Sequence, residues 1–137
     1  SRIVHPGESP TAISVSSAPG FDDIFGQRIL LKKELLEIAL DVGHEKLYGP
    51  RLGELFKKPD EVWQDNVEVH GSYWRYLKFH FDYLLIACVD IRDPQQPYVF
   101  LWLVLEYHAK AGSRSKGIQV KEQQRGILIH GPDVTIR

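Results

Sequence analysis

The chain has 137 residues, 43% of them apolar, which is enough for one domain with a hydrophobic core. Its formal net charge of -1 excludes a generally basic nucleic-acid coat, although a local basic patch is compatible with it. No apolar run reaches the roughly 18 residues of a membrane span and no signal-peptide pattern opens the chain, so we expect a cytoplasmic protein without a membrane partner. The first residue is not Met, which suggests a trimmed or excised chain.

The first 20 residues contain three prolines and a serine-rich patch, and they show no sustained apolar periodicity. A segment with so few large apolar side chains cannot offset the entropy of ordering itself. We therefore predict a flexible arm or linker over residues 1–20, followed by a single domain over residues 21–137.

Two helices are predicted at the start of the domain. The first covers residues 27–42, where apolar residues recur at spacings of three and four and Gly43 can end the helix. The second is shorter and covers residues 50–56, because Pro59 prevents a helix from continuing past it. Both helices carry one apolar stripe, which predicts that they cover one face of a sheet.

Strand signals follow, at residues 71–81, 83–91 and 98–108. The middle run is apolar at nearly every position, which is typical of a central strand covered on both faces. The connection over residues 92–97 is too short for a crossover, so the second and third strands should be antiparallel. A last short strand is predicted over residues 124–131. The fold class predicted is α+β, with N-terminal helices packed on an antiparallel sheet of about four strands.

The cysteine content excludes an internal disulfide, because Cys88 is the only cysteine. It lies within the apolar middle strand. Apolar surroundings disfavour the thiolate, so a buried structural thiol is favoured over a nucleophile.

The order of several motifs carries a resemblance. His44 follows the first predicted helix, the string Pro-Asp-Glu-Val-Trp at residues 59–63 precedes an aromatic, basic strand that contains Lys78, and Arg-Gly-Ile-Leu-Ile at residues 125–129 comes last. This order resembles the phage-associated nuclease-like domains grouped with barnase, the EndoU ribonucleases, colicin RNases and RelE toxins, over roughly residues 44–131. The resemblance implies a helix-plus-antiparallel-sheet fold whose active members cut RNA without a metal or other cofactor. It also implies RNA as substrate and a cognate inhibitor or a phage structural protein as a possible partner.

Metal-free RNA cleavage needs a base for the 2′-hydroxyl, an acid for the leaving oxygen and cations for the phosphorane. We predict His44 and His108 as the acid–base pair, His44 on the strength of the resemblance. Glu106 and His108 are two residues apart at a strand end and share a face, so the carboxylate can orient the ring. A helix end and a strand end that simply reach water are the alternatives for these positions.

Three cations are candidates for binding the substrate phosphate. Alternation places Arg75 and Lys78 on opposite faces of their strand, so at most one of them should touch substrate. The alternative for Lys78 is a stem that covers apolar surface beneath a solvated head. Arg125 precedes Gly126, which permits a close backbone approach, and it could hold a phosphate or cap a loop.

The sequence gives weaker support to metal-dependent chemistries. The six histidines have no spacing of the zinc type, so no metal site is predicted from them. Asp90 and Glu106 on neighbouring strands suggest a magnesium-dependent nuclease, but His108 stands where such a site usually has a lysine.

The alternative from another class is a non-catalytic protein-binding or phage structural module of the same fold. Three aromatic residues, Tyr73, Trp74 and Tyr76, offer a potential exposed contact surface. The family pattern also includes a hydroxyl residue near the third strand, and that position offers only the phenol of Tyr107. The absence puts catalytic activity in doubt more than fold.

Overall fold

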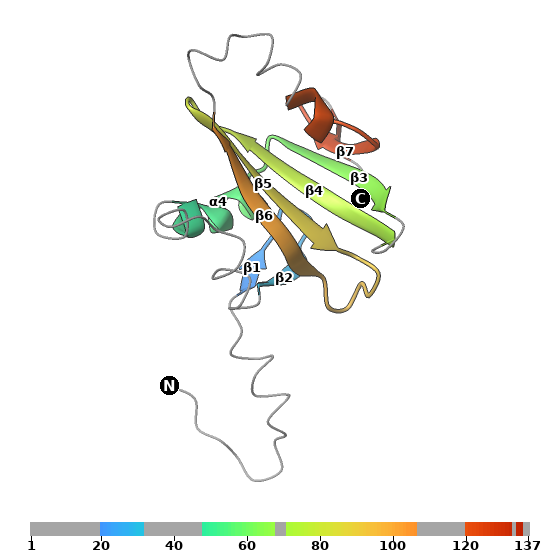
Figure 1. Ribbon diagram of the computed structural model, residues 1–137. Coiled ribbons are helices and arrows are strands. Elements are labelled where there is room, and N and C mark those ends of the chain that lie inside the picture. Colours follow the sequence, from blue (N-terminus) through green and yellow to red (C-terminus); the bar gives the residue numbers. More distant parts are fainter. Residues whose placement is uncertain (1–19, 32–47, 68–70, 107–119, 133, 136–137) are drawn as a thin grey trace, which may run out of the picture.

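The computed structural model describes residues 20–31, 48–67, 71–106, 120–132 and 134–135. Within these residues, eight strands form one sheet, in the spatial order β1-β2-β6-β5-β4-β3-β7-β8 (Figure 1). The strands are β1 (Gly20–Asp22), β2 (Arg28–Leu31), β3 (Glu61–Val67), β4 (Gly71–Phe79), β5 (Tyr83–Asp90), β6 (Tyr98–Glu106), β7 (Ile127–Gly131) and β8 (Val134–Thr135). Neighbouring strands are antiparallel except β2 and β6, which are parallel.

The predicted α+β fold of helices on a four-stranded sheet is wrong, because the described chain is mostly strand and its sheet is mixed. The long helix predicted over residues 27–42 begins instead as β2. Ile29 and Leu31 are buried there while Arg28 and Leu30 are not, which is the two-residue period of a strand. Pairing with β1 on one side and β6 on the other supplies hydrogen bonds that helical spacing could not reveal. Residues 32–42 lie outside the described residues.

The three central strands confirm the sequence prediction. β5 is buried at every position, as expected of a strand covered on both faces, and its pairing with β4 and β6 is antiparallel. The last predicted strand is also confirmed, as β7. Gly20 belongs to β1, so it lies in the sheet rather than in the arm, whose other residues are outside the described part.

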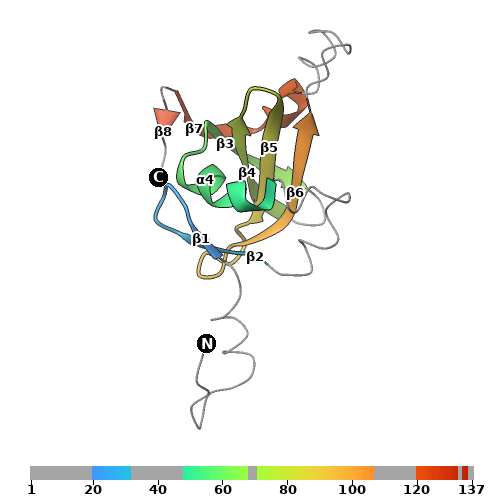
Figure 2. The same cartoon turned by 90° about the vertical axis from the view of Figure 1, so that its left-hand side faces the viewer.

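A short helix confirms the prediction over residues 50–56. It consists of the 3-10 turn η1 (Gly49–Arg51) and the helix α4 (Leu52–Lys57). Leu52, Leu55 and Phe56 are fully buried against one face of the sheet, and α4 lies in front of β4 in Figure 2. The following segment enters the sheet, because Glu61 opens β3.

The sheet separates two apolar clusters. The α4 face carries the larger one, whose members on the central strands include Tyr76, Leu85, Val89 and Trp102. We call the other side the opposite face; it carries Tyr73, Leu77, Leu84, Ile86 and Cys88, and Val120 of the helical turn at residues 120–123 packs against it. Alternation along each strand therefore decides which cluster a side chain joins.

On the α4 face, a buried carboxylate joins the β1–β2 turn to the centre of the sheet. Asp23 Oδ1 accepts hydrogen bonds from the backbone N–H groups of Phe25 and Gln27, at 2.9 and 2.7 Å. Its Oδ2 accepts from Gln27 Nε2 at 3.0 Å and from the hydroxyl of Tyr76 at 2.5 Å. Burial, followed by the charge of Asp23, raises the pKa of Tyr76, so its hydroxyl stays a donor.

Tyr76→Phe should lower the free energy of unfolding by about 2 kcal/mol, because a hydrogen bond to a buried charged group is worth more than one between neutral groups. Urea unfolding followed by tryptophan fluorescence measures the loss. Tyr98→Phe is the matched control: its hydroxyl donates to Asp90, but Arg92 compensates that carboxylate through hydrogen bonds as short as 2.7 Å. An equal loss in the two variants would contradict a special role for Tyr76.

Candidate functional site

Two of the predicted site residues lie on the α4 face. Lys78 Nζ donates to the backbone oxygen of Lys58 at 2.8 Å and lies 3.8 Å from Glu54 Oε1. Its side chain is only 17% exposed, in agreement with a stem that covers apolar surface. Glu106 ends β6 directly opposite Tyr83 in the strand pairing and is exposed.

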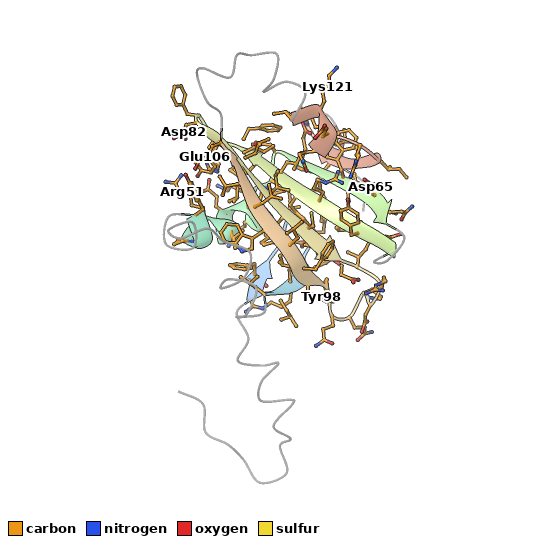
Figure 3. The ribbon with its side chains drawn as sticks, in the orientation of Figure 1. Arg51, Asp65, Asp82, Tyr98, Glu106 and Lys121 are labelled. Carbon is orange, nitrogen blue, oxygen red and sulfur yellow. The ribbon has the colours of Figure 1, made fainter. Side chains whose placement is uncertain are left out.

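Aromatic and charged groups gather around Tyr83 at this end of the sheet. The ring of His80 stacks on Tyr83 with centroids 4.4 Å apart, and Tyr48 packs edge-on against Tyr83 at 4.7 Å. Arg51 donates from Nη1 to the Tyr83 hydroxyl at 2.6 Å. Together with Glu106 these residues form what we call the hairpin-end cluster; Figure 3 labels Arg51, Asp82 and Glu106 at this end of the sheet.

The electrostatics of the hairpin-end cluster favour neutral rings. Burial lowers the pKa of His80, and the nearby Arg51 guanidinium lowers it further. Burial also raises the pKa of Tyr48, with a smaller contribution from the carboxylates of Glu106 and Asp82. The imidazole is therefore uncharged at neutral pH, as a general base would be.

Arg75 lies on the opposite face and is buried, with a side chain 3% exposed. Its Nη1 donates to the backbone oxygen of Gln123 at 2.9 Å and to that of Arg125 at 3.3 Å. Its Nη2 donates to Asp65 Oδ2 at 3.0 Å and to the hydroxyl of Tyr73. The guanidinium therefore attaches the segment before β7 to the sheet through hydrogen bonds, and its donors point into the protein.

Arg125 is joined to the same carboxylate. Its Nε donates to Asp65 Oδ2 at 2.9 Å, while its side chain remains 63% exposed. Burial works against ionisation of Asp65, but the Asn66 backbone N–H and the Arg75 guanidinium hold the pKa of this carboxyl below its usual range. The group is therefore an acidic centre shared by two arginines, and Arg125 is the more accessible of the two.

The predicted site residues do not share one face. Lys78 and Glu106 are on the α4 face, whereas Arg75 and Arg125 are on the opposite face. His44 and His108, the predicted acid–base pair, lie outside the described residues. The sheet therefore lies between the two pairs of predicted site residues that the structure describes.

The two-carboxylate alternative is excluded by the strand pairing. Asp90 pairs with Tyr98 at one end of the β5–β6 ladder and Glu106 pairs with Tyr83 at the other. Tyr83 and Asp90 are seven residues apart in β5, so at about 3.3 Å per residue the two carboxylates are roughly 23 Å apart along the strands. Within the described ranges, no three His, Cys, Asp or Glu side chains are grouped closely enough to hold a metal ion.

The prediction of an exposed contact surface on the aromatic strand is wrong for Tyr73 and Tyr76. Tyr73 is 4% exposed and Tyr76 is fully buried, because each belongs to one of the two apolar clusters. Cys88 is buried as predicted, and burial raises the pKa of its thiol to about 11.

Sequence reasoning missed Asp65 and the hairpin-end cluster. Asp65 acquires its role from Arg75 on the neighbouring strand and from Arg125, 60 residues away in the chain. Arg51 and Tyr83 are likewise 32 residues apart. One signal was available: His80 and Asp82 flank Phe81 in a short break between two strands, where side chains converge on a hairpin end.

No helix within the described residues has the length and apolar character needed to cross a membrane. No protein-family model matches the chain, and neither the curated proteins nor the solved structures compared with it gave a match. The resemblance to the nuclease-like domains therefore stays a prediction from the sequence.

Proposed function

We propose that this chain is a non-catalytic protein-binding module. The observation that carries the proposal is the division of the candidate substrate-binding groups between the two faces of the sheet. Stabilising a phosphorane requires cations preorganised around one point in space. Arg75 already uses its donors on Asp65, Tyr73 and two backbone oxygens, so releasing it to a phosphate would break those internal bonds.

The contact point favoured for a partner protein is the tip of the β4–β5 hairpin. Phe81 is 100% exposed there, beside the exposed carboxylate of Asp82. An aromatic anchor with a polar rim is typical of the residues that carry most of the energy of a protein interface. Burying the ring in a partner's apolar pocket is worth about 1.5–3 kcal/mol. The neighbouring carboxylate makes an anionic membrane surface a poorer fit than a protein pocket.

Metal-independent RNA cleavage is the second candidate function. It is favoured by the hairpin-end cluster, because Arg51, His80 and Glu106 lie with Lys78 at one end of the α4 face. A cation, a neutral imidazole and a carboxylate are the group types that this reaction needs.

Incubating the purified chain with labelled RNA in EDTA separates the two candidates. A binding module should leave the RNA intact at all protein concentrations, as should His44→Ala and His108→Ala. Cleavage in EDTA that falls at least about 100-fold in either histidine variant would overturn our proposal in favour of acid–base catalysis. Cleavage that appears only with magnesium would also overturn it.

The binding arm of the experiment places a photo-crosslinking amino acid at position 81 in cells that express the chain. We expect one discrete protein adduct, which an excess of the unmodified protein suppresses and an excess of Phe81→Ser does not. The same crosslinker at Gln95, exposed in the turn at the other end of β5, is the matched control. Equal labelling from both positions would contradict the assignment of Phe81 as the anchor.

A further inference from the structure

A backbone hydrogen bond between His80 and Tyr83 closes the turn between β4 and β5. His80 donates its backbone N–H to the backbone oxygen of Tyr83 at 2.8 Å, directly beyond the last strand pair, Phe79 with Leu84. Phe81 and Asp82 form the tip and are exposed. The conformation of the tip therefore depends on how firmly His80 and Tyr83 are held together.

The side chain of His80 packs on Tyr83 and makes no hydrogen bond through Nε2 within the described residues. Its ring lies almost parallel to that of Tyr83, with an interplanar angle of 14°. Its Nε2 atom is buried and has no hydrogen-bond partner among the described residues. A neutral imidazole can leave one nitrogen unpaired at modest cost, but a protonated ring carries an N–H on both nitrogens and a full charge.

The charged groups with the largest influence on His80 come from several neighbouring elements. Arg51 of η1 and Lys78 of β4 are cations, while Glu54 of α4 and Asp60, which precedes β3, are carboxylates. The cations oppose a charge on the imidazole and the carboxylates favour it. Burial is the largest influence and Arg51 the next, and both disfavour protonation. An additional positive charge on the imidazole is therefore poorly accommodated in the closed turn.

We propose that His80 is an acid-sensitive latch: protonation of its ring expels it from the stack on Tyr83 and loosens the tip that carries Phe81. The inference does not depend on the protein-binding function, because it concerns the closure of the turn itself. If Phe81 is the anchor for a partner, acidification would also change how that anchor is presented.

The direction of the effect follows from proton linkage. The pKa of His80 is lowered in the closed turn and returns toward its ordinary value near 6.5 when the ring meets water. The open turn thus binds more protons than the closed one. Closure is strongest above about pH 6.5 and weakens as the pH falls through the lowered value. Each unit between the two pKa values raises the ratio of open to closed turns about tenfold.

Amide hydrogen exchange followed by NMR on the full chain tests the latch between about pH 7.5 and about pH 5, where most carboxylates stay ionised. Protection factors corrected for intrinsic exchange are compared for the His80 amide, which bonds across the turn. In the wild-type chain we expect protection to fall at least about threefold on acidification. In His80→Phe, which keeps a stacking ring without a titrating nitrogen, protection should not change. Amides of the β3–β7 pairing, outside the turn, are the internal control.

The Cε1 proton of His80 provides an independent readout, because its chemical shift should titrate below the ordinary imidazole pKa. His80→Gln supplies the comparison if His80→Phe does not fold. An equal loss of protection in the wild-type chain and in the folded variant would overturn the latch. So would titration of His80 at its ordinary pKa, or titration without any change in the protection of the turn.

Discussion

Replacing Arg75 by methionine should lower the free energy of unfolding by about 3 kcal/mol or more, because it removes the charged donor of several hydrogen bonds, each worth about 1.5–3 kcal/mol. The methionine fills similar space but donates no hydrogen bond. The backbone oxygens of Gln123 and Arg125 would lose their donor, as would the hydroxyl of Tyr73. The helical turn at residues 120–123 would lose its hydrogen bond to the sheet through Gln123 and keep the packing of Val120 on the opposite face.

Urea unfolding measures this loss, and Arg28→Met provides the control. Arg28 also pairs with an aspartate, Asp22, at 3.5 Å, but the side chains are 59% and 72% exposed. An exposed pair of this kind contributes about 0–1 kcal/mol, so the control should unfold nearly as the parent does. If Arg75→Met were as stable as Arg28→Met, the hydrogen bonds of Arg75 would not stabilise the fold. The prediction of Arg75 as a substrate-binding residue would then regain weight.

Gly126→Ala should destabilise the protein by about 3 kcal/mol or more, among the larger effects of a single substitution. Gly126 has φ +100°, and a Cβ added there would lie 2.1 Å from the backbone oxygen of Gln64 in β3. Neither backbone can give way cheaply, because Gln64 pairs with Ile127, the residue after the glycine. The substitution would therefore disrupt the start of β7 and the position of Arg125.

Two other glycines divide this effect into its causes. Gly26 has φ +83° and no atom within 4 Å of an added Cβ, so Gly26→Ala should show only the conformational penalty of about 1–2 kcal/mol. Gly49 has neither a positive φ nor a close neighbour, so Gly49→Ala should be neutral or stabilising by up to about 1 kcal/mol. Thermal and urea unfolding of the three variants measure the series. A loss in Gly126→Ala no larger than in Gly26→Ala would rule out the backbone clash.

The candidate site shows how far local patterns reach. Glu106 and Lys78 could be placed on faces of their strands from alternation alone, and the structure agrees with those placements. For Lys78, alternation along the strand also predicted that it lies on the face away from Arg75. What alternation could not supply was the partner of each charge. Asp65 meets Arg75 only because β3 and β4 pair, and it meets Arg125 only because β7 joins β3.

The sequence by itself determined the central β-structure, because β4, β5 and β6 carry long apolar runs joined by short connections that permit only antiparallel pairing. It also determined the short helix before Pro59 and the burial of Cys88. Residues 28–31 were decided by the tertiary structure: their apolar spacing suits a helix as well as a strand, and the hydrogen bonds offered by β1 and β6 select the strand. The tertiary structure also decided the roles of the cations. A guanidinium stabilises the fold or remains available to a ligand according to which acceptors the fold brings within about 3 Å of it.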